Sequence, residues 1–190
     1  SEMCIRDRFQ RDEYLDRPTV INMSLGFRPE WISATQLQSV VHGVQLIVET
    51  LVVDFDVLPV VAIGNDGAGV VRAPGYYPET LSIGAVDPSL KPAWFSGSGL
   101  SPLTQQPEPN IAGYGVDVLG ALERNVAGYS MYAVKSGTSM AAPYVTGVAA
   151  LVAQKYPGMQ GLELKQHLLD HALPLPDADG RAGVGLARVT

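Results

Sequence analysis

The residues best suited to chemistry lie in segment 136–143, SGTSMAAP, which continues into the apolar stretch YVTGVAALV. The residues around Ser139 are small, so a substrate backbone could come close to its hydroxyl, and the apolar stretch predicts a buried helix that begins here. The first N–H groups of a helix lack partners within it and carry partial positive charge, which would stabilise the oxyanion formed when a serine attacks a carbonyl. Taken alone, however, the segment is better explained as an ordinary capped helix start with Pro143 in its first turn.

The elements that would hold Ser139 in place follow an α/β order. Residues 19–25 and 58–63 are apolar, β-branched runs that each predict a buried strand. A helix of about residues 33–51 is predicted between them, because its apolar residues recur at the spacing of one helical face. This face consists of Leu37, Val40, Val41, Val44, Ile47, Val48 and Leu51.

A strand–helix–strand unit of this kind brings the ends of both parallel strands to one edge of the sheet, where open α/β sheets carry their sites. Gly26 ends the first strand, and the turn GNDGAG at 64–69 ends the second. We therefore expect Leu25 and Gly26 to lie close to Gly64 and Asn65.

The second half of the chain predicts more strands and then helices. Strands are expected at 80–86, 93–96 and 115–120, and the polar stretch 98–109 is expected to be a surface loop. Helices are expected at about 139–156, stopped by Pro157–Gly158, and at 162–172. The pattern as a whole is that of a single α/β domain with a mainly parallel sheet.

Composition excludes several classes of function. The 190 residues carry a net charge of −6 without a basic cluster, which argues against a nucleic-acid partner. The longest apolar stretches are interrupted by polar residues well short of the roughly 20 residues that a membrane span needs, so no span is predicted. Cys4 is the only cysteine, so an intrachain disulfide and a thiolate metal cluster are excluded.

The first eight residues, SEMCIRDR, do not fit the rest of the chain. They open without methionine, lack the features of a signal peptide and resemble a translated sequencing adapter. We therefore expect residues 1–8 to be a non-native tail that is not part of the fold.

Four blocks of the sequence together resemble the subtilisin-like serine peptidases, the subtilases. In the order of that family they are VINMSLG at 20–26, VVAIGNDG at 60–67, YYPETLSIGAVD at 76–87 and SGTSMAAPYVTGVAALV at 136–152. The resemblance extends from Val20 to the C-terminus. It implies a three-layer α/β/α fold with a mainly parallel sheet, and it makes residues 9–190 an N-terminally truncated part of a subtilase catalytic domain.

The resemblance also implies roles for individual residues. Ser139 would be the nucleophile, and the Asn65 side-chain amide would share the oxyanion with the backbone N–H of Ser139. Read without the resemblance, Asn65 is an ordinary turn residue. The substrate would be an extended peptide or protein segment that pairs with the chain as an added strand. The residues expected to bind it are Ser24, Leu25 and Gly26 at the strand edge, Ala62, Ile63 and Gly64 at the primary specificity pocket, and Thr138 beside the nucleophile.

A serine needs a base, and that base needs a carboxylate to orient it. The family order of Asp, His and then Ser would put both partners before residue 20, yet residues 1–19 contain no histidine. The three histidines present, His42, His167 and His171, are predicted to be ordinary helix residues. We therefore expect the Asp and His to lie upstream and the chain alone to be inactive or nearly so.

Two other classes of protein share parts of this pattern. An α/β-hydrolase would need Gly-x-Ser-x-Gly, but Ala141 replaces the final glycine, and the adjacent Asp170 and His171 point in different directions from one helix. A subtilase-like domain that binds a partner without catalysis stays open as the alternative.

The remaining expectations come from the family. The chemistry would need no cofactor, and calcium could stabilise the fold, although no ligand cluster can be assigned; secretion is implied by the family alone. Three departures stand out: Tyr144 replaces a histidine in a packing position, the Ala-Pro-Gly turn is absent near residues 118–121, and residues 28–32, with Trp31, could be an insertion at the rim of the groove.

Overall fold

The computed structural model describes residues 17–27, 33–122, 131–175 and 180–190. Its centre is a sheet of β1 (Thr19–Met23), β2 (Val57–Ala62), β3 (Leu81–Val86) and β6 (Ile111–Tyr114), in the order β1-β2-β3-β6. Every pairing in this sheet is parallel, and Val20 lies opposite Leu58. The predicted parallel α/β sheet is therefore confirmed.

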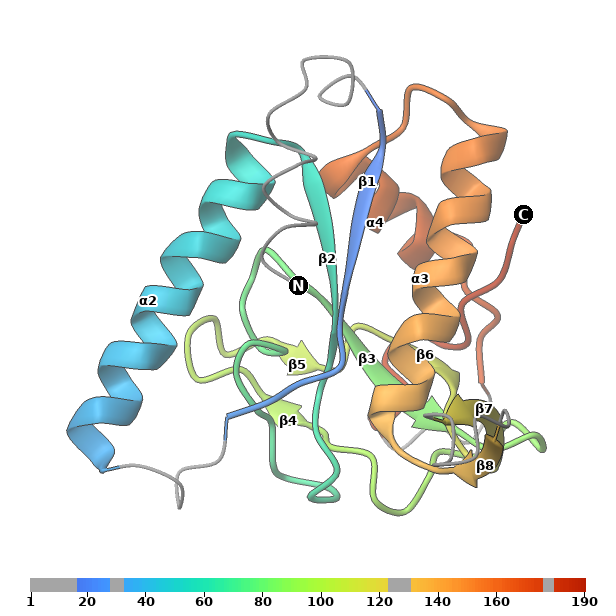
Figure 1. The fold of residues 1–190 in the computed structure, drawn as a ribbon, viewed down its shortest axis with the longest axis horizontal. Helices are drawn as coiled ribbons and strands as arrows, with labels where there is room; N and C mark the ends of the chain where they lie inside the picture. Colours follow the sequence, from blue (N-terminus) through green and yellow to red (C-terminus); the bar gives the residue numbers. More distant parts are fainter. Residues whose placement is uncertain (1–16, 28–32, 123–130, 176–179) are drawn as a thin grey trace.

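Helices cover both faces of the sheet (Figure 1). Helix α2 (Ala34–Val53) lies on one face, while α3 (Thr138–Lys155) and α4 (Gly161–Asp170) lie on the other. Parallel strands need such cover because both of their faces must be buried, and β2 and β3 are buried along their whole lengths. The layers are those of the three-layer α/β/α arrangement that the family resemblance implies.

Helix α2 connects β1 to β2 and completes the predicted strand–helix–strand unit. Its start is fixed by a capping box between Ser33 and Gln36. Val48 and Val52 are buried, and the Tyr77 hydroxyl donates to the Val41 carbonyl at 2.6 Å.

The predicted apolar face of α2 is only partly right. Val40 and Ile47 are 40% and 61% exposed, although the sequence places them on that face. The better-buried stripe is narrower and runs through Val41, Val44 and Val48, which pack with Ala73 and Tyr77 from the connection between β2 and β3. One α2 segment, Gln36–Val53, is long and apolar enough to cross a membrane, by length and composition only, which is weak evidence for a span.

The main core lies between the sheet and α3. Leu58, Val60, Leu81 and Ile83 pack against α3 side chains from this face. The helix approaches β6 closely at Gly113, where a Cβ would lie 2.6 Å from the Ala141 carbonyl oxygen, so a larger residue would push the helix away. The buried α3 side chains of this core are Ala141, Ala142, Val145, Val148, Ala149, Val152 and Ala153.

Several predicted strands need correction. Residues 93–96 form a turn and not a strand: the Ser96 N–H donates to the Ala93 carbonyl, and Trp94 is 80% exposed. The predicted strand 115–120 begins too early, since Gly115–Asp117 connects β6 to β7 (Val118–Leu122), which pairs antiparallel with β8 (Met131–Lys135). The strand β6 was not predicted, and the loop 98–109 contains the short ribbon of β4 (Gly99–Leu100) and β5 (Pro107–Glu108).

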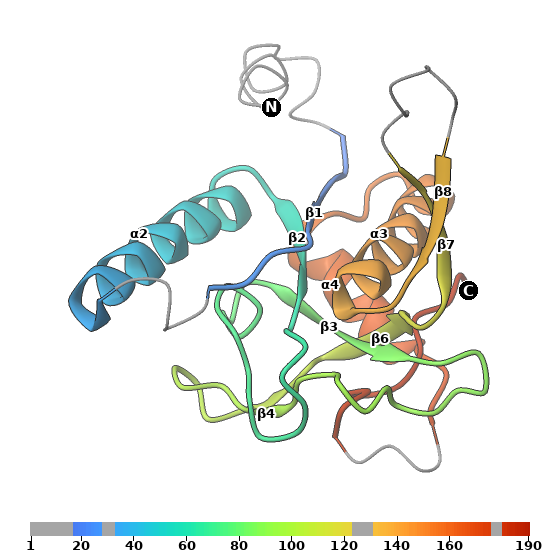
Figure 2. The ribbon, with the colours of Figure 1, turned by 60° about the horizontal axis from the view of Figure 1, so that its bottom comes forward.

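The hairpin β7–β8 stands beside the start of α3 and extends away from the sheet (Figure 2). It carries exposed apolar side chains, among them Leu119 and Tyr132. At the other end of the chain, Leu186 bridges to Ala112 of β6, so the C-terminal segment covers that strand. The predictions for residues 1–8 and for the insertion at 28–32 lie outside the described residues.

Candidate active site

The start of α3 is tied to the end of β1 through the Ser139 carbonyl, which cannot accept the usual helical hydrogen bond from residue 143. Pro143 has no N–H, so it cannot donate to the Ser139 carbonyl four residues earlier. The Ser24 hydroxyl fills this gap and donates to the Ser139 carbonyl at 2.9 Å, while the Asn22 amide donates to the Ser24 hydroxyl at 3.1 Å. The proline in the first turn thus leaves an acceptor that locks the position of Ser139 relative to β1.

Asn65 is held by the residue that precedes Ser139. The Asn65 side-chain oxygen accepts from the Thr138 backbone N–H at 2.8 Å and from the Thr138 hydroxyl at 3.0 Å. Because both Thr138 groups are donors, the Asn65 atom that they contact must be the amide oxygen. The Asn65 Nδ2 therefore points away from Thr138. Within the part of the chain that the structure describes, neither this Nδ2 nor the Ser139 backbone N–H has an acceptor.

A cleft of about 360 Å³ opens between the ends of β1 and β2 and the first turn of α3. Leu25 and Gly26 meet Gly64 and Asn65 there, as the strand–helix–strand topology predicts. The fully buried Ile63 is the exception among the predicted site residues: it lies behind the cleft and not in its wall. The lining residues are Ser24, Leu25, Gly26, Ala62, Gly64, Asn65, Arg72, Thr138 and Ser139.

A second hollow, of about 240 Å³, lies on the other side of Ser139. Its wall is formed by the hairpin β7–β8 and the first two turns of α3, including Met140 and Pro143. Ser139 borders both hollows. If an extended peptide lay across this serine, the peptide residues before and after the serine would therefore lie in different hollows.

Arg72 is the cleft residue that sequence reasoning missed. Its side chain runs between the two strand ends: its Cδ would lie 3.3 Å from a Cβ placed on Gly26 and 3.1 Å from one on Gly64. The guanidinium donates to the Phe27 carbonyl at 3.0 Å and pairs side-on with the Asp66 carboxylate. The one available signal was a lone cation, Arg72, in an otherwise apolar and glycine-rich loop.

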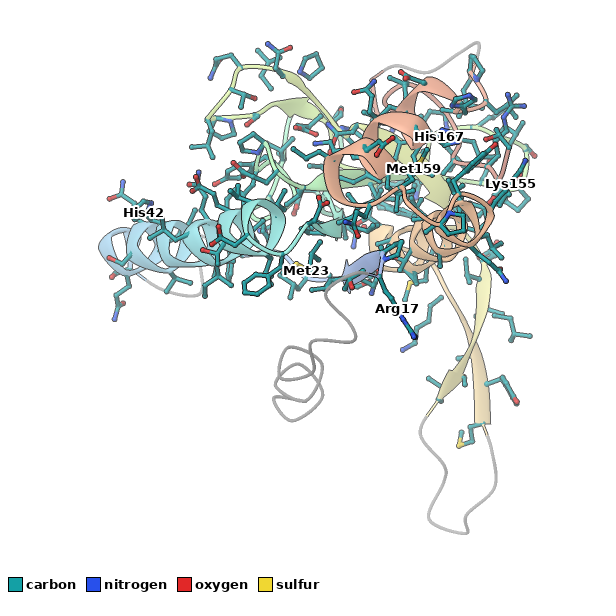
Figure 3. The ribbon with its side chains drawn as sticks, turned by 90° about the horizontal axis from the view of Figure 1, so that it is seen from above. Arg17, Met23, His42, Lys155, Met159 and His167 are labelled. Carbon is teal, nitrogen blue, oxygen red and sulfur yellow. The ribbon has the colours of Figure 1, made fainter. Side chains whose placement is uncertain are left out.

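None of the three histidines lines either hollow around Ser139. His42 lies on α2 and His167 on α4, on opposite sides of the sheet (Figure 3). The His167 Nε2 is 3.2 Å from the Thr190 hydroxyl, and its ring stacks on His171 at 4.1 Å. Burial, and then the neighbouring His171, lower the pKa of His167. The arrangement agrees with the prediction that these histidines belong to ordinary helices.

Two further polar groups are structural. Burial raises the pKa of Glu108, which accepts from Ser82 of β3 and from Asn110 and so ties β5 to β3. Tyr144 packs as expected: its hydroxyl donates to the Ala187 carbonyl at 3.3 Å, and its ring meets Tyr114 edge to face. Among the described residues no group of three or more His, Cys, Asp or Glu side chains could hold a metal ion, so no ligands are assigned to a possible structural calcium.

Fold and cleft together define a class of protein: a parallel α/β domain with a serine in the first turn of a helix, beside the ends of two strands. Comparison with known proteins points the same way. A family model described as the subtilase family matches residues 5–185. The match includes residues 5–8, so the boundary of the expected tail at residue 8 stays a prediction. Subtilisin-like protease PopC of Myxococcus xanthus strain DK1622 is 41% identical over 184 residues, 95% of this chain and 38% of that protein.

Other relatives agree. Alkaline elastase YaB of Bacillus sp. strain YaB is 40% identical over 121 residues, 63% of this chain and 28% of that protein. The structure of the prenylagaramide maturation protease PagA is similar with a TM-score of 0.66 at 29% identity, covering 90% of this chain and 59% of that one. The chain therefore belongs to the subtilase family of subtilisin-like serine proteases. It spans less than two thirds of the length of each of these three relatives.

Proposed function

We propose that the protein containing these 190 residues is a serine endopeptidase in which Ser139 attacks the peptide carbonyl. The observation that carries the proposal is the pair of donors at the cleft, the Ser139 backbone N–H and the Asn65 Nδ2, which lack acceptors among the described residues while the groups around them are bonded. Donors fixed in advance toward a developing negative charge are what acyl transfer requires.

In this mechanism the substrate lies as an extended strand along the end of β1. Residues on the acyl side of the scissile bond would enter the cleft of Asn65, and the leaving-group side would pass over the hollow beside the hairpin β7–β8. Among the described strands β1 lies at the edge of the sheet, and the segment Ser24–Gly26 that follows it would pair with the substrate as an added strand.

The proton of the Ser139 hydroxyl must pass to a base that the described chain does not bring to the cleft, since its histidines lie on α2 and α4. We assign this role to a histidine oriented by an aspartate, both outside these 190 residues. The oxyanion would be held by the Ser139 N–H and Asn65 until the leaving amine takes the proton and departs; water then hydrolyses the acyl-enzyme.

The test is peptide hydrolysis by the full-length protein and its Ser139→Ala variant. Loss of the nucleophile is expected to lower kcat by about 10⁶, the magnitude measured for subtilisin itself. Ser89→Ala is the matched control, because Ser89 is exposed in the turn after β3 and lines neither hollow around Ser139. Hydrolysis that persists in Ser139→Ala would overturn the proposal.

The second candidate is a domain that binds extended peptides without cleaving them. The absence of a histidine at the cleft favours it for the 190 residues alone. A full-length protein that binds peptides with Ser139 in place but hydrolyses none would establish this alternative.

A further inference from the structure

The cleft contains one charged side chain, and it sits where the substrate side chain would enter. Of the described residues that line the cleft, Arg72 alone is charged; the others are small, apolar or neutral polar residues. The cleft also borders Ser139 and Asn65, so a group bound near Arg72 belongs to the substrate residue next to the reacting carbonyl. Resting on the proposed function, this placement bears on which substrates the site takes.

Packing holds the stem of Arg72 in place. The side chain passes between Gly26 and Gly64, where a Cβ on either glycine would lie within 3.3 Å of Arg72 carbons. The Arg72 backbone N–H donates to the Ile63 carbonyl at 3.1 Å. The buried Ile63 therefore supports the cleft from behind by anchoring Arg72.

The Arg72 guanidinium is bound to the backbone on one side, while on its other side the partner is a carboxylate that another carboxylate can replace. Its Nη1 donates to the Phe27 carbonyl, which is part of the backbone and cannot leave. Its Nε and Nη2 bind the Asp66 carboxylate, and the Asp66 side chain is the more exposed partner, at 26% against 12% for Arg72. Asp66 does not line the cleft. A substrate carboxylate that enters the cleft therefore contacts Arg72 and not Asp66. It can then replace Asp66 as the acceptor for the Nε and Nη2 donors of the planar guanidinium.

We propose that Arg72 selects substrates with an acidic side chain, glutamate above all, on the acyl side of the scissile bond. A carboxylate there gains charge-assisted hydrogen bonds to Arg72, a neutral amide of the same size gains weaker ones, and a lysine is repelled. The small walls formed by Gly26, Ala62 and Gly64 leave room for a side chain but offer an apolar one little surface.

The experiment uses the full-length protein and four peptides that differ only in the acyl-side residue: Glu, Gln, Leu and Lys. The ratio of kcat/KM for Glu over Gln is expected to be about tenfold, because a charge-assisted hydrogen bond is roughly twice as strong as a neutral one and the guanidinium can donate two of them to one carboxylate. Arg72→Gln should bring this ratio close to one, and Arg72→Lys should keep it above one. Asp66→Asn should raise it, because the competing carboxylate is gone.

Arg188→Gln is the matched control. It also removes one positive charge, but Arg188 donates to the His171 carbonyl and does not line the cleft, so the ratio should not change. The thermal midpoint of each variant is measured alongside. If Arg72→Gln does not fold, Arg72→Lys and Asp66→Asn carry the test, since both keep hydrogen-bonding groups of similar size.

A second readout separates this inference from the proposed function. Peptides that end in Glu or in Gln at the acyl-side position are titrated onto Ser139→Ala, with and without Arg72→Gln. Cleavage without preference for Glu would overturn the inference and leave the endopeptidase standing. Arg72-dependent tighter binding of the Glu peptide, without cleavage of any peptide, would support the inference and overturn the endopeptidase. A preference for Glu that Arg72→Gln leaves unchanged would overturn the role of Arg72.

Discussion

The start of α3 and the end of α4 both gather polar side chains that could take part in catalysis, but their hydrogen bonds are arranged in opposite ways. At the start of α3, Ser24 donates to the Ser139 carbonyl, and Thr138 donates to the Asn65 side-chain oxygen. The Ser139 N–H and the Asn65 Nδ2 are left without acceptors in the described structure. On α4, the His167 and His171 rings stack on each other and bond to Thr190 and to a helix carbonyl.

The difference shows that the type of residue alone does not mark a catalytic site. The histidine pair has the residue type of a base, but its partners belong to the C-terminal segment and to its own helix. The serine and asparagine have less reactive side chains, yet their surroundings hold them beside an open cleft. A site is recognised where some polar groups are fixed in place while others are kept ready for a substrate.

The strongest way to break this comparison is to remove a ready donor. In the full-length protein, Asn65→Ala should lower kcat by about 10²–10³ with little change in KM, a magnitude that comes from subtilisin itself. Asn65→Asp sharpens the test, because it keeps an oxygen for Thr138 to donate to but puts a second oxygen in place of the donor Nδ2. Steady-state kinetics on both variants provide the measurement, and an unchanged kcat in either would contradict the oxyanion role.

A smaller effect is expected from the residue that orients this donor. Thr138→Val removes the hydroxyl that donates to the Asn65 oxygen at 3.0 Å but keeps the backbone N–H and the side-chain size. One such hydrogen bond contributes about 1 kcal/mol, which corresponds to about fivefold in kcat. Thr138→Ser, which keeps the hydroxyl, is the control and should retain the rate. Equal rates in Thr138→Val and wild type would show that the Thr138 N–H alone fixes Asn65.

The next prediction concerns stability more than rate. Ser24→Ala leaves the Ser139 carbonyl without its donor, since Pro143 cannot supply one. The free energy of unfolding should fall by about 1 kcal/mol, measured by urea denaturation. Pro143→Ala in the Ser24→Ala background should recover part of the loss, because the new N–H at residue 143 can donate to the same carbonyl. No recovery would contradict the explanation that the proline creates the need for Ser24.

The smallest effect is expected at the histidine pair, where activity should not depend on His167. Its pKa is lowered from the ordinary value of 6.5 by burial, by His171 and by Lys155, against the opposing carboxylates of Asp170 and Glu163. The unfolded chain therefore binds this proton at higher pH than the folded chain, and the free energy of unfolding should fall as the pH drops below 6.5. His167→Gln should weaken that dependence while leaving kcat unchanged. A loss of activity in this variant would make α4 part of the site.

Much of the fold follows from the sequence because the buried elements carry long apolar patterns. β2, β3 and α3 are mostly apolar segments, and α2 shows its helical period, so all four lie within a few residues of their predicted positions. The meeting of Leu25–Gly26 with Gly64–Asn65 also follows, since it depends only on two parallel strands joined by a crossover.

The parts that were missed depend on contacts between distant segments. The strand β6 has only four residues, and the C-terminal segment that pairs at Ala112 lies more than 70 residues further along. Arg72 has no local pattern that places it in the cleft, because its position depends on Gly26 and Phe27 from the end of β1. The exposure of Ile47 on α2 likewise depends on how much of the helix the sheet contacts.

The most direct test of the account is to ask which residue of the full-length protein reacts with a fluorophosphonate, followed by peptide mapping by mass spectrometry. The account predicts one modified serine, Ser139, no modification in Ser139→Ala, and slower labelling in Asn65→Ala, because the phosphonyl oxygen uses the same donors as the oxyanion. Modification of another serine, or a folded, peptide-cleaving protein in which Ser139 stays unmodified, would contradict it.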